Sequence, residues 1–182
     1  MSEPAIDAGA PSDWVCRFAA RIRAGGSVLD VACGGGRHAR YLASRGFDVV
    51  AVDIDRVALD TLAGNPRICV EHADLEGGPW PFAARRFDAV VVTRYLHRAL
   101  LPRILDALAP DGVLIYETFA AGNEQYGRPR NPEFLLQPGE LLELVRGRLR
   151  VIAFEDLYVE SPKPAMIQRI CAVHARAGEK KP

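Results

Sequence analysis

A carboxylate and three glycines lie close together near the start of the chain. Asp30 belongs to the apolar run SVLDVA, and Gly34, Gly35 and Gly36 follow it in LDVACGGGRH. Glycine lets the backbone adopt turn angles that a side chain forbids and lets a ligand approach the main chain closely. A carboxylate beside such a turn favours a ligand group that is positively charged or donates hydrogen bonds. The spacing therefore predicts a ligand-binding turn.

This turn allows two interpretations, which differ in the ligand. Gly34, Gly36 and Ala39 fit G-x-G-x-x-A, the glycine pattern of a dinucleotide-binding turn. The pyrophosphate of a dinucleotide would, however, be repelled by the Asp30 carboxylate unless water or a cation screened it. An ammonium group reverses the sign of that interaction, and S-adenosylmethionine carries an α-ammonium, two free ribose hydroxyls and no phosphate. Asp30 therefore favours S-adenosylmethionine, and an NAD(P)-dependent oxidoreductase is the alternative.

Further acidic and apolar residues complete the predicted cofactor pocket. Asp53 lies 17 residues after Gly36 and is placed to bind both ribose hydroxyls, a role that an NAD pocket would share. Asp74 is placed to accept from the adenine amino group or, alternatively, to cap a turn. Ile54 and Leu75 would supply apolar walls. The predicted cofactor-binding residues are Asp30, Ala32, Gly34, Gly36, Asp53, Ile54, Asp74, Leu75 and Thr93.

Alternating strand-like and helix-like segments position this pocket. Apolar runs predict strands at 27–32, 47–53, 66–72, 87–93 and 112–119. Apolar residues at helical spacing predict helices at about 12–23, around 40–42, within 54–64 and from Leu100 through Leu108, where APDG is a stop signal. This alternation predicts an α/β fold with a parallel sheet and helices on both faces.

The last third of the chain departs from this alternation. Residues 120–132 form a polar loop with two glycines and two prolines, which is either a lid over the site or a static connection. After a helix in PGELLELVRG, the strand-like runs LRVIAFEDLYVE and AMIQRICAVHA are separated only by SPKP. So short a link permits a hairpin but no parallel crossover, so the last strand is expected to be antiparallel. The SPKP turn is expected to reach the rim of the acceptor pocket.

Composition and local sequence features argue against several classes of protein. Lysine plus arginine equals aspartate plus glutamate at 23 each in 182 residues, so nucleic acid is not favoured as a partner. The chain has no secretory leader and no apolar run of bilayer length, and its four cysteines include no CxxC pair. We expect a soluble cytoplasmic protein with reduced thiols. Cys69 and His72 lack a second ligand pair, so no metal site is expected.

The run VLDVACGGGRHARYLASRGFDVVAVDID resembles motif I and the following acidic strand of class I S-adenosylmethionine-dependent methyltransferases, whose pattern is acidic-x-Gly-x-Gly-x-Gly. Asp30, Gly34 and Gly36 match this pattern, whereas Ala32 replaces its first glycine. The segments ADLEGGPWPFAARRFDAVVVTRYLH and LAPDGVLIYETF are similar to the adenine loop and the fourth and fifth strands of the family. Among its members, the chain looks most like small bacterial enzymes related to tellurite-resistance methyltransferases.

The resemblance implies a fold and a division of the chain. The fold is a three-layer Rossmann-like one, with a seven-stranded, mostly parallel sheet whose last strand is antiparallel. Residues 1–182 would form a single methyltransferase domain. Its expected parts are an N-terminal helix at about 12–23, a cofactor-binding core at about 27–119, a substrate-side loop at 120–132, and a C-terminal helix and strand hairpin at 138–176.

Residues after the fourth strand are the candidates for the acceptor side. Members of this superfamily that methylate amines of nucleic-acid bases often carry Asn or Asp, two prolines and an aromatic there. This chain reads TRYLH instead, which argues against that subclass and favours a small-molecule acceptor. His97 is a candidate general base or else an exposed helix-start residue, and Tyr95 is a candidate catalytic residue or else part of the core. Arg94 is the third catalytic candidate.

Basic residues on two segments predict the charge of the acceptor. Arg94 and Arg98, together with Arg128 and Arg130 of the long loop, would hold an anionic acceptor or else form a solvated face. The sequence specifies neither the acceptor atom nor the oligomeric state. A non-catalytic module that binds S-adenosylmethionine is a further alternative.

Overall fold

The computed structural model describes residues 9–174. Residues 1–8 and 175–182 lie outside the described part of the chain. The last two residues of the predicted hairpin region at 138–176 fall among them.

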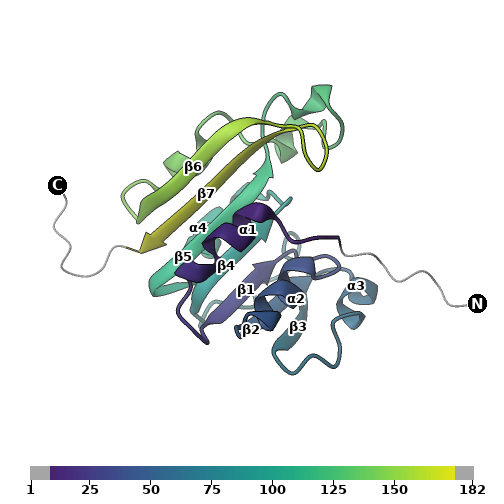
Figure 1. The fold of residues 1–182 in the computed structure, drawn as a ribbon, viewed down its shortest axis with the longest axis vertical. Coiled ribbons are helices and arrows are strands. Elements are labelled where there is room, and N and C mark those ends of the chain that lie inside the picture. The colour runs from purple at the N-terminus through teal and green to yellow at the C-terminus, as the bar shows by residue number, and fades with distance from the viewer. Residues whose placement is uncertain (1–8, 175–182) are drawn as a thin grey trace, which may run out of the picture.

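Seven strands form one sheet in the order β3-β2-β1-β4-β5-β7-β6 (Figure 1). Neighbours from β3 through β5 pair in parallel, whereas β7 is antiparallel to both β5 and β6. The predicted seven-stranded sheet and its C-terminal hairpin are thus confirmed. The strands are β1 Ser27–Val31, β2 Asp48–Asp53, β3 Ile68–His72, β4 Phe87–Thr93, β5 Leu108–Phe119, β6 Leu149–Val159 and β7 Ala165–His174.

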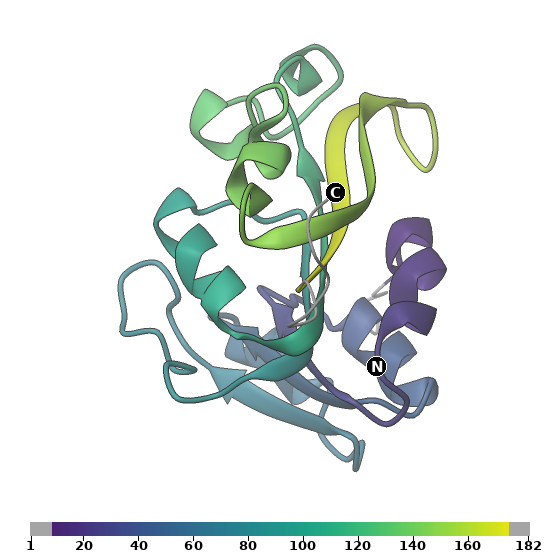
Figure 2. The same ribbon diagram turned by 90° about the vertical axis from the view of Figure 1, so that its left-hand side faces the viewer.

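Helices cover both faces of the sheet, as a three-layer fold requires. On one face lie α1 (Asp13–Phe18), α2 (Arg37–Ser44) and α3 (Arg56–Asp60), and on the other lie α4 (Leu101–Asp106) and α5 (Glu140–Val145) (Figure 2). The 3₁₀ helices are η1 (Ala19–Arg21), η2 (Arg98–Leu100), η3 (Asn123–Gln125) and η4 (Pro132–Phe134). No helix among residues 9–174 is both long enough and apolar enough to cross a bilayer.

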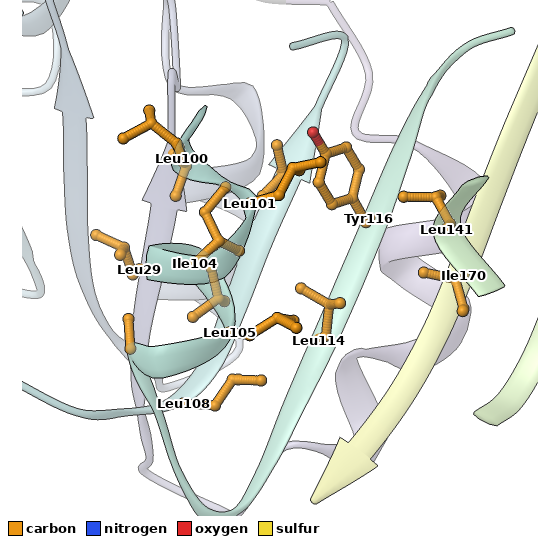
Figure 3. Packing of buried hydrophobic residues seen from close by; sticks show 14 of the residues in the cluster. Leu29, Leu100, Leu101, Ile104, Leu105, Leu108, Leu114, Tyr116, Leu141 and Ile170 are labelled. Atoms are coloured by element: carbon orange, nitrogen blue, oxygen red, sulfur yellow. The ribbon is translucent and has the colours of Figure 1, made fainter. Parts of the chain in front are cut away.

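The central strands bury side chains on both faces, which explains their continuous apolar runs. Because successive side chains alternate, Leu29 of β1 packs toward α4 and α5, while Val28 packs toward α1 and α2. Figure 3 shows the first of these layers, in which Ile104 and Leu105 of α4 and Leu114 of β5 belong to one buried cluster. Burial of each such aliphatic side chain stabilises the fold by roughly 1.5–3 kcal/mol. The two layers hold the sheet edge at which β1, β2 and β4 end.

Two predicted helices are shorter in the structure. The N-terminal helix stops at Phe18 and continues only as η1. The helix expected to reach Leu108 ends at Asp106, because Phe87 donates its backbone N–H to the Ala107 carbonyl at 2.8 Å and Leu108 pairs with β4. Leu108 is buried in the same core layer, so its apolar character fits a helix or a strand equally well.

Candidate functional site

The glycine turn leaves β1 at the point where the sheet changes direction. β1 pairs with β2 on one side and β4 on the other, and such a switch point is where ligands bind in open α/β sheets. Ala32, Gly34 and Gly36 all have positive φ angles, of 51°, 52° and 72°. Only glycine adopts this region without a steric cost, so Ala32 is strained where the family pattern has a glycine.

Asp30 carries the site's unmatched charge. Its side chain is buried, at 1% exposure, and neither carboxylate oxygen has a hydrogen-bond partner among the described residues. Burial raises the pKa of Asp30 to about 7; the nearby backbone N–H of Ala39 and the charge of Arg37 oppose the rise, and the Asp53 carboxylate adds a smaller one. A buried polar group without a partner costs free energy that a bound donor would recover. The observation fits the ammonium group expected at this position.

Gly34 and Gly36, the two glycines of the turn that match the family pattern, have different surroundings. A Cβ on Gly34 would meet no atom, so that side of the turn is open to a ligand. A Cβ on Gly36 would overlap the buried Leu62 side chain, so Gly36 lets α2 begin directly against the α3 region. Arg40 holds the turn from outside, because its guanidinium donates to the carbonyl oxygens of Gly35 and Thr61.

Asp53 closes the turn on the β2 side. Its Oδ2 accepts the backbone N–H of Gly34 at 2.7 Å, and its Oδ1 accepts that of Asp55 at 2.9 Å. Each oxygen keeps a second acceptor position, which is what two ribose hydroxyls need. Ile54 beside it is 61% exposed, an unusual state for a large apolar side chain that a bound ring would cover.

Asp74 and Leu75 follow β3 and lie in different environments. The exposed Asp74 accepts the backbone N–H groups of Gly77 and Glu76 through Oδ1, at 2.9 and 3.0 Å, and these bonds lower its pKa. Asp74 is thus a turn cap, the alternative that the sequence left open, and its Oδ2 carries no hydrogen bond among the described residues. Leu75 is 7% exposed and packs in the core layer on the α4 side.

Tyr95 lies near the acidic residues at the ends of β2 and β3. Its Oη is buried without a hydrogen-bond partner in the described part of the chain. Burial raises its pKa, and the carboxylates of Glu76, Asp74 and Asp53 raise it further. Asp53 ends β2, Asp74 and Glu76 follow β3, and Tyr95 packs against the core layer that contains Leu75.

A histidine that the sequence analysis did not single out joins three segments. His38 of α2 is buried; its Nε2 accepts the backbone N–H of Ser12 at 3.1 Å, and its Nδ1 lies 3.2 Å from Thr93 Oγ1. Burial lowers the pKa of His38 to about 3, and Arg37 and Arg94 lower it further, so the ring is neutral. Ser12 Oγ in turn donates to Glu117 at 2.8 Å. The segment before α1 is thereby fixed across the ends of β4 and β5.

A cavity of about 950 Å³ adjoins this end of the sheet. Its walls come from five separate parts of the chain. These are residues 9–13, the start of α2, the end of β4, the end of β5 with the loop that follows it, and the β6–β7 hairpin. The SPKP turn lines it, in agreement with its predicted place at the rim. The basic residues that line the cavity are Arg37, Arg94, Arg128, Lys163 and Arg169.

Two of the four arginines expected around an acceptor are elsewhere. Arg98 is already bound by Glu140 at 2.8 and 2.9 Å and by the carbonyls of Glu133 and Leu135, so its predicted role is wrong. Arg130 is exposed and does not line the cavity. His97 precedes η2 and does not line the cavity either, so a catalytic role for it stays a prediction.

Buried Asn123 anchors the loop after β5. Its Nδ2 donates to the Pro129 carbonyl and its Oδ1 accepts the Met166 N–H of β7, both at 3.2 Å. Tyr126 also stacks against Tyr158 of β6, with ring centroids 5.0 Å apart. These contacts hold the loop as a cavity wall.

Parts of the chain are similar in sequence to known methyltransferases. Residues 28–112 match a family described as a methyltransferase domain. An uncharacterized methyltransferase from Mycobacterium tuberculosis is 39% identical over 108 residues, covering 55% of this chain and 54% of that protein. A demethylmenaquinone methyltransferase from Clavibacter sepedonicus is 34% identical over 106 residues, covering 53% of this chain and 42% of the relative. The chain therefore spans about half the length of the curated relatives it matches.

Solved structures share the fold at low sequence identity. TehB from Haemophilus influenzae has a TM-score of 0.70 at 18% identity, covering 90% of this chain and 62% of its own. A TehB-like SAM-dependent methyltransferase from Corynebacterium glutamicum has a TM-score of 0.65 at 21% identity, with 89% and 87% covered. Residues 28–112 are thus similar to a methyltransferase domain, and residues 9–174 share the fold of these two structures.

Proposed function

We propose that this chain transfers a methyl group from S-adenosylmethionine to a small-molecule acceptor. The observation that carries the proposal is the buried Asp30 carboxylate, which has no partner in the described structure and stands at the head of an open glycine turn. A pyrophosphate would add negative charge beside it, whereas an ammonium group would satisfy it. This difference favours methyl transfer over the NAD(P)-dependent oxidoreductase.

The residues around the turn would hold the donor as follows. Asp30 would accept from the ammonium group, while the backbone from Ala32 to Gly36 allows close approach. Asp53 would accept from the ribose hydroxyls, and exposed Ile54 would cover the adenine ring, with Asp74, Leu75 and Thr93 completing the pocket. The bound donor supplies an electrophilic methyl group on its sulfonium sulfur.

The acceptor would enter through the 950 Å³ cavity beyond β4 and β5. An in-line displacement asks the protein mainly for positioning, so a general base is needed only where the acceptor carries a proton. Arg94 lines the cavity and would position the acceptor. His97 is retained as a candidate base, and we reassign Tyr95 to the donor side of the site. A structure of similar fold from Burkholderia thailandensis is described with 1,6-didemethyltoxoflavin and S-adenosylhomocysteine bound, which supports a small-molecule acceptor.

The proposal extends to the division of the chain. Residues 1–182 would act as one methyltransferase domain, with the donor bound by about 27–119 and the acceptor by 120–132 and the hairpin. Cys16, Cys33, Cys69 and Cys171 are free thiols, which supports a cytoplasmic location.

Calorimetric titration with S-adenosylmethionine, S-adenosylhomocysteine and NADH tests the donor. We expect the first two to bind and NADH to give no heat of binding; tight NADH binding without a response to the sulfonium would overturn the proposal. Release of S-adenosylhomocysteine is then measured across thiols, organic acids, phenols and amines. Binding of the donor without turnover of any acceptor would favour the non-catalytic module instead.

A further inference from the structure

The acceptor cavity carries more positive than negative charge. Five basic side chains line it, against the two acidic side chains Asp13 and Glu117. Glu117 is already used, because Arg169 Nη1 lies 3.1 Å from its Oε2. The side chains of Arg94, Arg128 and Lys163 form no hydrogen bond or ion pair within residues 9–174. The cavity therefore holds three cationic groups that the protein itself does not neutralise.

Two of the cations that line the cavity, Arg37 and Arg94, repel one another. Burial lowers the pKa of Arg37 and the charge of Arg94 lowers it further, while the carboxylates of Glu117 and Asp30 oppose this. Arg94 also has a φ of 54°, a conformation that costs a non-glycine residue free energy, and its backbone N–H donates to the Glu117 carbonyl at 2.9 Å. An anion bound in the cavity near Arg37 and Arg94 would relieve this repulsion.

The size and walls of the cavity add a second requirement. A volume of about 950 Å³ is at the upper end for a small organic ligand and far exceeds that of an inorganic oxyanion. Phe119, Val159, Pro162 and Ile167 contribute apolar surface to the same walls. The cavity suits a molecule with an apolar body as well as a charged group.

We propose that the methyl acceptor is an organic anion, with a carboxylate, sulfonate or phosphate group held by Arg94, Arg128 and Lys163 and an apolar body against the hairpin and Phe119. The inference rests on the proposed function and names its acceptor class. Lys163 of the hairpin turn lines the cavity, whereas Arg98 and Arg130, which the sequence also offered, do not. A neutral amine or a bare oxyanion would leave either the charge or the apolar wall unmatched.

Paired probes that differ only in charge test this. Naphthalene-2-carboxylate, indole-3-acetate and 4-hydroxybenzoate are titrated beside their carboxamides and beside inorganic phosphate, with and without S-adenosylhomocysteine. We expect at least one acid to bind at least about tenfold more tightly than its amide, because charge-assisted hydrogen bonds to guanidinium are stronger than neutral ones. Phosphate should bind more weakly than that acid.

Charge reversal identifies the cations responsible. Arg128→Glu should abolish the preference for the acid, whereas Arg130→Glu, two residues away on the same loop and outside the cavity, should keep it. Equal binding of every acid and its amide, or phosphate binding as tightly as the best acid, would overturn the inference. Titration without S-adenosylhomocysteine measures the preference for the acid even if the donor does not bind. Failure of the proposed function, which appears as absent donor binding, is therefore distinguished from failure of this inference.

Discussion

The donor half and the acceptor half of the site are built in different ways. The central part of the donor half is one stretch of chain, in which Asp30, the turn to Gly36 and Asp53 lie within 24 residues and the Asp53 carboxylate accepts the backbone N–H of Gly34. The acceptor half collects side chains from five distant segments around a cavity. Backbone geometry defines the first half, and the position of flexible charged side chains defines the second.

This difference predicts how each half responds to substitution. In the donor half, replacing a glycine of the turn by alanine should change the stability of the protein. Removing the charge of Asp30 should change the affinity for the donor. In the acceptor half, substitutions should alter acceptor binding and leave the donor affinity unchanged. Variants confined to one half therefore test whether the two are independent.

Gly36→Ala should give the largest effect. Its φ of 72° costs alanine about 1 kcal/mol, and the new Cβ would overlap buried Leu62, which adds about 1–3 kcal/mol. We expect the free energy of unfolding to fall by about 2–4 kcal/mol in denaturant titration. Gly34→Ala is the matched control, because its φ is 52° but its Cβ meets nothing, so about 1 kcal/mol is expected. Equal losses would mean that the contact with Leu62 does not distinguish the two glycines.

Asp30→Asn should weaken donor binding and stabilise the empty protein. Removing the charge that faces the ammonium should lower the affinity for S-adenosylhomocysteine by about 10–100-fold. Binding of 5′-methylthioadenosine, which lacks the ammonium, should change little. Asp60→Asn, which alters an exposed carboxylate in α3, is the control. An unchanged affinity for S-adenosylhomocysteine would remove Asp30 from the donor site.

The pH dependence follows from the same residue. The pKa of Asp30 rises from 3.8 to about 7 on folding, so the folded state favours the protonated form. Its contribution to stability is fully present below pH 4 and is lost as the pH rises through 7. Donor affinity should change in the opposite direction, falling as the pH drops below 7, because the ammonium needs the carboxylate. The melting temperature and the calorimetric donor affinity are measured between pH 5 and 8. In the Asp30→Asn variant, these opposite pH trends should disappear.

The turn of the donor half is visible in the sequence because Asp30, Gly34 and Gly36 lie close together in the chain and are recognisable from type and spacing. The alternation of apolar runs predicts the parallel sheet, whereas the order of its strands is seen only in the structure. The sequence shows that Ala32 departs from the glycine pattern, but only the structure shows its positive φ and hence the strain.

The acceptor half is less predictable because it depends on where the chain turns. Positive φ at Arg94 ends the alternation of β4, so periodicity does not place Tyr95, His97 or Arg98. Tyr95 consequently faces the carboxylates after β2 and β3, and Arg98 binds Glu140, 42 residues away. The sequence places His38 in the helix after the glycine turn, and nothing in the neighbouring residues indicates its contact with Ser12.

Asn123→Ala should damage the acceptor half alone. It leaves the Met166 N–H and the Pro129 carbonyl without their partner, which costs about 1–2 kcal/mol of stability and loosens the cavity wall. Acceptor binding should weaken while the calorimetric affinity for S-adenosylhomocysteine stays unchanged. Asn131→Ala removes an exposed cap of η4 in the same region and should affect both less. A loss of donor affinity in Asn123→Ala would show that the halves are coupled.

Ala32→Gly should give the smallest effect and the opposite sign. Relief of the strain at a φ of 51° gains about 1–2 kcal/mol, and the greater freedom of glycine in the unfolded chain offsets about 0.4–1 kcal/mol of it. We expect the free energy of unfolding to rise by about 0.5 kcal/mol, with donor affinity unchanged. Ala43→Gly, within α2 where φ is helical, should instead lower it by about 1 kcal/mol. If both substitutions destabilise the protein equally, the backbone at Ala32 is not strained, and the donor half tolerates alanine there because its turn geometry differs from that of the family pattern.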